Sequence, residues 1–392
     1  MKCKVDVERL RGYKIKLYPT EAQKKKLNRF IELSRYVYNW AVATINEAYA
    51  ITGEFSSFTQ LCKIFKDFRH KLSWLEEIPV CTARQAIKDA VNGFMKFFNK
   101  QANHPKFKRK SKPYKKSFTS RGERMYIFGD SIKLEGFERG DLILAKDHRL
   151  PSGEGIYYYD PTITFDGDNY WLSTTIYKEV QPLDIPVSEP IGIDVGIRNL
   201  VTTSYGETFH LPDTSKLQKR RNRQRRRLQK DYDKLLAEGK RTKTKYHDMP
   251  KSKNMLKRQT ALRKTFRRIS NINNTYIHTM TKRILDRNPS AIVIENISVE
   301  EMTKKNPFLN RKKPQMMFYT IHEQLRYKAA DRGIPVITAD KYFPSTKTCN
   351  RCGYINNIGS SAIYTCEACG YTIDRDLNAA YNLRDLAYNN QY

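Results

Sequence analysis

CNRCGYINNIGSSAIYTCEACGYTIDRDLN, residues 349–378, is the stretch that decides most about this protein. It holds two Cys-x-x-Cys pairs, Cys349 with Cys352 and Cys366 with Cys369, separated by 13 residues. Each pair can present two thiolates from one tight turn, and the gap lets the second turn fold back on the first. Four sulfurs can then surround one ion tetrahedrally, so the spacing predicts one structural zinc.

The residues around the cysteines support this interpretation. Gly353 and Gly370 each follow the second cysteine of a pair, where the turn often needs a positive φ. The alternative is two disulfides, but the remaining cysteines, Cys3, Cys62 and Cys81, are scattered. The N-terminus has no apolar segment after its charges and so does not resemble a signal peptide. These features favour reduced thiols and a cytoplasmic protein.

Composition points to a polyanionic partner. The 392 residues allow two or three domains, and 39% hydrophobic and 12% aromatic residues predict that most of the chain folds. Seventy-two basic and 41 acidic residues give a net charge of +31, which indicates a nucleic acid or a membrane surface. We find no run of about 18 apolar residues and no lipidation motif, so nucleic acid is favoured over a membrane.

The N-terminal half changes its pattern several times. Residues 11–19 alternate as in a strand, and Thr20 with Gln23 forms a capping-box pattern. Helices are expected at residues 20–50, 58–68 and 82–99. The aromatic residues on the first helix are expected in its core rather than on a base-stacking surface.

A basic loop and a run of strands follow. Residues 104–116 carry seven basic residues, broken by Pro105 and Pro113, and the candidates for nucleic-acid contact are Lys106, Lys108, Arg109 and Lys110. Short strands are expected at residues 125–128, 131–134, 141–145, 156–159, 162–165 and 170–177. They predict a small antiparallel barrel or sheet, which the strand at 11–19 rejoins with the helices as an insertion. Three prolines mark residues 180–190 as a linker.

The second half alternates α and β elements and contains a strongly basic helix. Residues 216–230 hold nine basic residues in 15 and no acid. A solvated helix is one interpretation, but the mutual repulsion of nine like charges favours contact with phosphates. The candidates are Lys219, Arg220, Arg221, Arg223, Arg225, Arg226 and Arg227. Another helix is expected at about residues 254–287.

Three acidic positions lie on different elements of this half. Asp194 stands between Gly192 and Gly196 on a strand, where the bare glycines let another backbone approach closely. Glu295 follows a continuous apolar run typical of a buried central strand, at the end where ligands of α/β sheets collect. The alternatives are an edge-strand Asp in a bulge and a Glu that only terminates its strand.

The third position is the pair Asp374 and Asp376, which precedes a helix. Either can cap that helix, but capping explains only one of them. Three carboxylates that converge at one sheet edge would hold two divalent cations about 3.5–4 Å apart, as phosphodiester hydrolysis requires. Carboxylate oxygens are hard ligands, so the expected cation is Mg²⁺. The chain has no Walker A loop, no G-x-S-x-G elbow and no H-E-x-x-H motif.

Together these motifs resemble a known family. GIDVGIRNL at 192–200, IENI at 294–297, STKTC-x-x-CG at 345–353 and DRDLNAA at 374–380 occur in the order of three RuvC motifs with an inserted zinc module. YKIKLYPT at 13–20 and YVYNW at 36–40 resemble the start of the same family. The chain is similar to TnpB, the transposon-encoded RNA-guided DNA endonuclease related to type V CRISPR effectors.

The resemblance implies an α/β and α+β multidomain fold with an RNase H-like nuclease and a wedge β-barrel interrupted by a helical recognition lobe. The implied segments are wedge at 1–18 and 105–186, recognition lobe at 19–104, nuclease at 187–340 and 371–392, and a zinc-ribbon insert at 341–370. Asp194 and Glu295 match the first two catalytic acids. The family pattern Asp-x-Asn-Ala-Ala selects Asp376 over Asp374 as the third.

The resemblance also implies partners, namely a guide RNA from the transposon end and double-stranded target DNA, with a short motif beside the target read by the N-terminal half. Three alternatives stay open at this point: a compact CRISPR effector, a non-cleaving RNA-guided repressor, and a metal-dependent transposase on the same nuclease fold.

Overall fold

A computed structural model describes residues 8–109, 116–138, 140–146, 150–153, 156–179, 187–244, 249–296, 317–357, 359 and 361–389. The chain forms two compact units, Met1–Glu179 and Val180–Tyr392, each built on its own sheet and core. In the part of the chain that is described, no helix is both long and apolar enough to cross a membrane.

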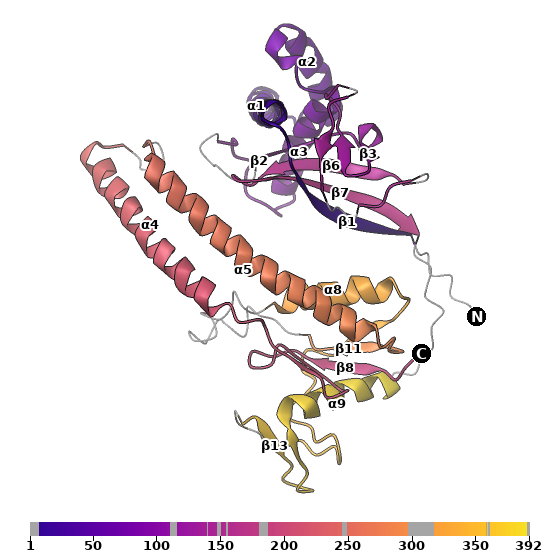
Figure 1. The fold of residues 1–392 in the computed structure, drawn as a ribbon. Coiled ribbons are helices and arrows are strands. Elements are labelled where there is room, and N and C mark those ends of the chain that lie inside the picture. Colours follow the sequence, from indigo (N-terminus) through magenta and orange to yellow (C-terminus); the bar gives the residue numbers. More distant parts are fainter. Residues whose placement is uncertain are drawn as a thin grey trace. The chain divides into compact units, whose positions relative to one another are not determined.

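The N-terminal unit is built on a four-stranded antiparallel sheet. Its order is β1 (Glu8–Leu17), β7 (Tyr170–Glu179), β6 (Tyr158–Phe165) and β2 (Lys116–Thr119) (Figure 1). β1 pairs with β7 along its whole length. This pairing confirms that the first strand rejoins the later ones, with the helices between them. A second sheet contains β3 (Tyr126–Phe128), β4 (Ser131–Lys133) and β5 (Ile143–Leu144).

Two strand predictions were wrong. The strands expected at residues 156–159 and 162–165 form one strand, β6, with a register shift between Tyr159 and Thr162. Asp160 has a φ of 45° in this bulge, which bends the strand without ending it. β2 was not predicted; it is held by pairing with β6 and by the buried Phe118.

Helices α1 (Glu21–Thr52), α2 (Phe58–His70) and α3 (Val80–Phe98) form a core of their own. The Thr20 hydroxyl accepts a hydrogen bond from the Gln23 amide, and the Gln23 side chain accepts one from the Thr20 amide, which confirms the predicted capping box. Trp40 of α1 stacks on Phe68 of α2, with ring centroids 5.6 Å apart. The aromatic side chains on this face of α1 are therefore core residues, as expected.

The C-terminal unit contains a five-stranded mixed sheet. Its order is β10 (Thr208–Phe209), β9 (Val201–Thr203), β8 (Ile191–Asp194), β11 (Ile292–Ile294) and β12 (Val336–Thr338). β8, β11 and β12 are parallel, whereas β9 runs antiparallel to β8. The carboxyl ends of β8 and β11 therefore meet at the same edge of the sheet.

Helices cover both faces of this sheet (Figure 1). α5 (Lys253–Leu285) and α8 (Phe318–Ala330) pack on the face of Ile193 and Ile292, and α9 (Arg375–Asn389) packs on the face of Val293. Gly192 makes the second contact possible, because a Cβ there would lie 2.0 Å from the Ala380 carbonyl oxygen of α9. The close backbone approach expected beside Asp194 is made by this helix.

Two further features position the functional residues. α4 (Ser215–Arg241) runs beside α5, and the Thr265 hydroxyl of α5 donates to the Gln224 side chain of α4 at 2.9 Å. The hairpin of β13 (Ile363–Thr365) and β14 (Thr372–Asp374) leads directly into α9. The cysteine-bearing segment is therefore joined without a loop to the helix that carries Asp376.

Candidate metal centres and nucleic-acid surfaces

The four cysteines of the two Cys-x-x-Cys pairs form one cluster. Their sulfurs all lie within 4.8 Å of one another, and none is in a disulfide. Sγ of Cys349 is 3.7 Å from Sγ of Cys369, and Sγ of Cys352 is 3.6 Å from Sγ of Cys366. Thiolates about 2.3 Å from a tetrahedral zinc ion lie about 3.8 Å apart, so the cluster fits one zinc.

The two cysteine turns have the same geometry. The Cys349 amide donates to the Tyr354 carbonyl, and the Cys366 amide donates to the Tyr371 carbonyl. Gly353 and Gly370 have φ of 75° and 69°, which confirms the predicted left-handed positions. Burial opposes ionisation of the Cys366 thiol, but the amides of Cys369 and Ala368 lower its pKa to about 6. The second turn thus favours a thiolate at Cys366, the form that binds a metal; at Cys352 the Tyr354 amide lowers the pKa, but burial and the neighbouring sulfurs outweigh it and raise that pKa.

Three acidic side chains gather at the edge where β8 and β11 end. Asp194 is the last residue of β8, Glu295 follows β11, and Asp376 lies in the first turn of α9. Burial raises the pKa of Asp194 well above its usual range, and the carboxylates of Glu295 and Asp376 raise it further. The site therefore holds negative charges that are poorly hydrated and repel one another.

Two neighbouring side chains orient this group. The Ser345 hydroxyl donates a hydrogen bond to Oε1 of Glu295, which partly offsets the burial that raises the pKa of Glu295. The Asn199 amide donates to Oδ2 of Asp376 at 3.0 Å. Sequence reasoning missed both roles, although Ser345 and Asn199 lie within the motifs quoted above.

The structure separates the roles of the two neighbouring aspartates. Oδ1 of Asp374 accepts hydrogen bonds from the backbone amides of Asp376 at 2.9 Å and Leu377 at 3.1 Å. Asp374 therefore caps α9, and the Asp376 side chain is left to face Asn199 and the Arg375 guanidinium.

The carboxylate group is wider than the cysteine cluster. Among the described residues, only the four cysteines place all their ligand atoms within 4.8 Å of one another. A pair of divalent cations about 3.5–4 Å apart spreads its ligands over a larger space than one ion does. Buried carboxylates with raised pKa values are stabilised by such cations, so the donor set fits hard divalent ions.

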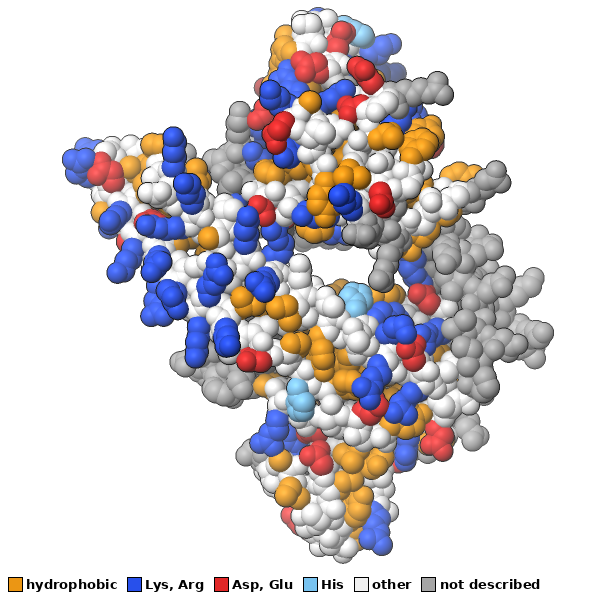
Figure 2. Space-filling model, in the orientation of Figure 1, with side chains coloured by type: hydrophobic (Ala, Val, Ile, Leu, Met, Phe, Trp, Pro, Cys, Tyr) orange, Lys and Arg blue, Asp and Glu red, His pale blue; other side chains and the backbone are white. Residues whose placement is uncertain are grey.

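The predicted basic helix, residues 216–230, is the N-terminal half of α4 (Figure 2). Leu228 is buried, and the Arg221 guanidinium lies over the Phe266 ring of α5, 5.4 Å from its centroid. The other basic candidates point to solvent, namely Lys219, Arg220, Arg223, Arg225, Arg226 and Arg227. Among the described residues, no ion pair is found between the five arginines of this set and an acidic side chain, whereas the charge of Lys219 interacts with Asp213.

The second basic candidate segment behaves differently. The Lys108 ammonium lies 3.8 Å from the centre of the Tyr38 ring, and burial lowers the Lys108 pKa. Its backbone amide donates to the Asn39 side chain at 2.7 Å, and its carbonyl accepts from that side chain at 3.0 Å. Lys106, Lys108 and Arg109 are all exposed as whole residues, but Lys108 is the one whose ammonium and backbone contact α1; Lys110 lies outside the described residues.

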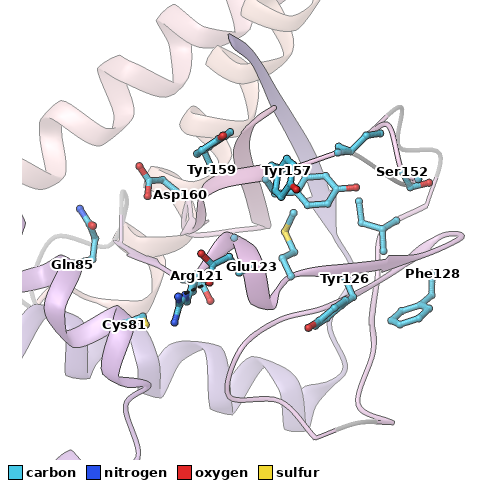
Figure 3. Close-up of a pocket in the computed structure, with 17 residues that line it drawn as sticks. Cys81, Gln85, Arg121, Glu123, Tyr126, Phe128, Ser152, Tyr157, Tyr159 and Asp160 are labelled. Atoms are coloured by element: carbon cyan, nitrogen blue, oxygen red, sulfur yellow. Dashed lines mark ion pairs between the residues drawn. The ribbon is translucent and has the colours of Figure 1, made fainter. Parts of the chain in front are cut away.

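The N-terminal unit also contains a cavity of about 810 Å³ (Figure 3). One end of it is lined by three exposed aromatic side chains, Tyr126, Phe128 and Tyr157. Gln85 lies at the opposite end. The buried hydroxyl of Ser120, which also lines the cavity, has no hydrogen-bond partner among the described residues. Aromatic rings beside an unpaired hydroxyl suit a planar ligand with polar edges.

Three family models match this chain. A helix-turn-helix domain model covers residues 9–54, a model described as a probable transposase covers residues 176–306, and the Cas12f1-like TNB domain model covers residues 318–383. The last match runs from α8 into α9 and contains all four cysteines of the cluster.

Two curated relatives match almost the whole chain. "Putative RNA-guided DNA endonuclease" of Streptomyces pristinaespiralis is 27% identical over 95% of this chain and 88% of its own length. "TnpB-like protein L79" of Acanthamoeba polyphaga mimivirus is 26% identical over 94% of this chain and 72% of its own length. The chain is therefore similar over almost its whole length to proteins named as TnpB-like or as putative RNA-guided DNA endonucleases.

A solved structure shows the same fold. The protein of a Cas12f1–sgRNA–target DNA complex superposes on this chain with a TM-score of 0.56 at 13% identity. The match covers 97% of this chain and 99% of the other, so the fold relationship extends over both units of the chain.

Proposed function

We propose that this TnpB-like protein is an RNA-guided, divalent-metal-dependent DNA endonuclease encoded by a transposable element. The observation that carries the proposal is the group of three carboxylates at one sheet edge, the buried Asp194 and Asp376 and the half-buried Glu295. Repulsion between these carboxylates raises the pKa of Asp194, and bound cations would offset that repulsion. The near full-length match to a relative named for RNA-guided DNA cleavage supports the same activity.

The five-stranded sheet is the proposed RuvC, or RNase H-like, nuclease core. Its support is the topology: β8 pairs antiparallel with β9 on one side and parallel with β11 on the other. Asp194 and Glu295 then fall at the same edge, and α9 crosses β8 to add Asp376. The paired N-terminal strand and the helices inserted after it are the proposed wedge and recognition lobe.

Asp194, Glu295 and Asp376 would hold two Mg²⁺ ions. When bound, such a pair activates water and stabilises the leaving oxygen of a phosphodiester. The chain itself orients the ligands: Asn199 fixes Asp376, Ser345 fixes Glu295, and the Asp374 cap fixes the first turn of α9. The four cysteines would hold one zinc ion that keeps the hairpin leading into α9 in place.

The partners follow from charge and from the family. The uncompensated arginines of α4 would hold the phosphate backbone of a guide RNA or of its duplex with the target DNA. The guide would supply sequence specificity by base pairing, and the N-terminal unit would read a short motif beside the target. The aromatic cavity around Ser120 is the proposed place for that contact.

Sequencing the RNA that copurifies with the protein tests this proposal. Double-stranded DNA that matches the RNA should then be cut in Mg²⁺, and DNA of scrambled sequence should stay intact. Specific binding without cutting would indicate a repressor, and joined strands instead of breaks would indicate a transposase. RNA derived from a repeat array would assign the protein to the CRISPR effectors. Cutting that ignores the RNA sequence would overturn the proposal.

A further inference from the structure

A hydrogen-bonded bridge connects Glu295 to the first zinc turn. Ser345, which is 1% exposed, donates its hydroxyl hydrogen to Oε1 of Glu295. Four residues later the chain enters the turn at Cys349. The hydroxyl that orients the carboxylate and the first zinc ligand therefore belong to one short segment.

α9 fixes this segment from its other side. The Asn382 side-chain amide donates to the carbonyls of Ser345 and Thr348, both at 2.7 Å. One turn earlier, the Asn378 side chain donates to the Thr348 carbonyl at 2.7 Å and accepts from the Asn350 amide at 3.1 Å. Both asparagines are buried, so these bonds are shielded from water.

We propose that Ser345 is a positioning residue for Glu295, and that Asn382 couples this position to the first zinc turn. The proposal rests on the proposed role of Glu295 as a cation ligand. One carboxylate oxygen takes the hydroxyl hydrogen, which leaves the other oxygen in a fixed direction for a cation. The zinc module thus sets the geometry of Glu295 through Ser345, in addition to leading the chain into Asp376.

Mn²⁺ binding measures this role without relying on cleavage. The probe is Mn²⁺ titrated into the zinc-loaded, full-length protein without nucleic acid and followed by electron paramagnetic resonance. Ser345→Ala should weaken Mn²⁺ binding about 10- to 100-fold, as loss of a partner behind a metal ligand typically does. Ser345→Thr, which keeps a hydroxyl, should bind more tightly than Ser345→Ala. The exposed Thr372→Ala is the control and should bind as the wild type does.

A double variant distinguishes positioning from general destabilisation. If Ser345 acts through Glu295, Ser345→Ala should add nothing to the loss caused by Glu295→Ala. Additive losses, or wild-type Mn²⁺ affinity in Ser345→Ala, overturn the inference. Unchanged affinity in Glu295→Ala would instead overturn the proposed function. If Ser345→Ala loses its zinc, Asn382→Ala is measured in its place. Wild-type Mn²⁺ affinity in Asn382→Ala would contradict the coupling.

Discussion

The two candidate metal centres of the C-terminal unit differ in how the fold prepares them. The four cysteine sulfurs already lie at the spacing of a tetrahedral zinc site, and matching backbone turns hold them there. Two of the three carboxylates are buried and the third is half-buried, and burial and repulsion raise the Asp194 pKa. One centre is prepared by geometry, and the other is held in an electrostatically unfavourable arrangement by the fold around it.

The difference indicates what each centre is for. A structural metal works best in a closed site that its own chain segment completes. A catalytic pair needs an open, wider arrangement with unfavourable charge that arriving cations and substrate can offset. The neighbours differ between two of the carboxylates: Ser345 donates to one oxygen of Glu295, whereas Asn199 and Arg375 donate to the two oxygens of Asp376.

The largest expected effect comes from removing one carboxylate. Asp194→Ala, Glu295→Ala and Asp376→Ala should each abolish cleavage of matched DNA, because each removes a cation ligand. RNA and target binding should persist, and the zinc content should stay at one ion per chain. Glu323→Ala, an exposed acid on α8, is the control and should cut normally. Cleavage by any of the three variants would contradict the assignment of that residue.

Opening the zinc centre should have the next largest effect. Cys352→Ser should lose the zinc, as measured by elemental analysis, and reduce cleavage strongly, because the hairpin leads into α9 and the segment of Ser345 leads into the first cysteine turn. Cys62→Ser, outside the cluster, should keep both zinc and cleavage. A variant that loses zinc but cuts at the wild-type rate would show that the two centres are independent.

The basic residues of α4 should contribute to RNA binding but not to the binding of zinc or of the divalent cations. Changing Arg220, Arg223, Arg225 and Arg226 together to Gln should weaken RNA binding uniformly across guide sequences. The slope of log K against log salt should fall by about 0.7–0.9 for each phosphate that an arginine no longer neutralises. Titrations of RNA binding at several salt concentrations measure this slope. An unchanged slope would make α4 a solvated helix.

The carboxylate centre should also affect stability in a pH-dependent way. A carboxyl whose pKa is raised by folding favours the folded state at low pH, and this contribution is lost as pH rises through the raised value. In Mg²⁺-free buffer, the free energy of unfolding should therefore fall as pH rises above the ordinary carboxyl range. Asp194→Asn should show a smaller fall, as should the wild type with added Mg²⁺. Denaturant unfolding at several pH values checks this, and identical slopes would contradict it.

The smallest effect is expected at the cap. Asp374→Ala should cost about 0.5–2 kcal/mol of stability through loss of the cap and leave cleavage largely intact. Asp374→Asn keeps a capping oxygen and should be nearly neutral in denaturant unfolding. If Asp374→Ala abolishes cleavage and Asp376→Ala does not, the two roles are reversed.

The sequence predicts the zinc centre better than the carboxylate centre for a physical reason. The zinc ligands lie in two local turns, so spacing and glycine positions suffice to find them. The carboxylates come from three elements, and their order matched a family pattern, but Asn199 and Ser345 can be recognised as partners only in three dimensions. Which of Asp374 and Asp376 caps α9 likewise depends on the three-dimensional contacts, because only the structure shows which side chain accepts hydrogen bonds from the α9 amides.

The fold shows the same limit. Long amphipathic helices and the capping box at Thr20 are local features, and both were predicted. Strand β2 depends on pairing with β6, much later in the chain, and the bulge at Asp160 depends on the register against the following strand β7; both were missed. Lys108 resembled its basic neighbours in sequence, but its contact with Tyr38 depends on how the segment docks on α1.

The most direct test is to measure both metals in the same sample. Protein equilibrated with Mn²⁺, freed of nucleic acid and analysed for metal content should contain one zinc and two manganese ions per chain. Asp194→Ala should keep the zinc and lose manganese, and Cys352→Ser should lose the zinc. Wild-type manganese content in Asp194→Ala would contradict the account, because the buried carboxylates would then not be the cation site.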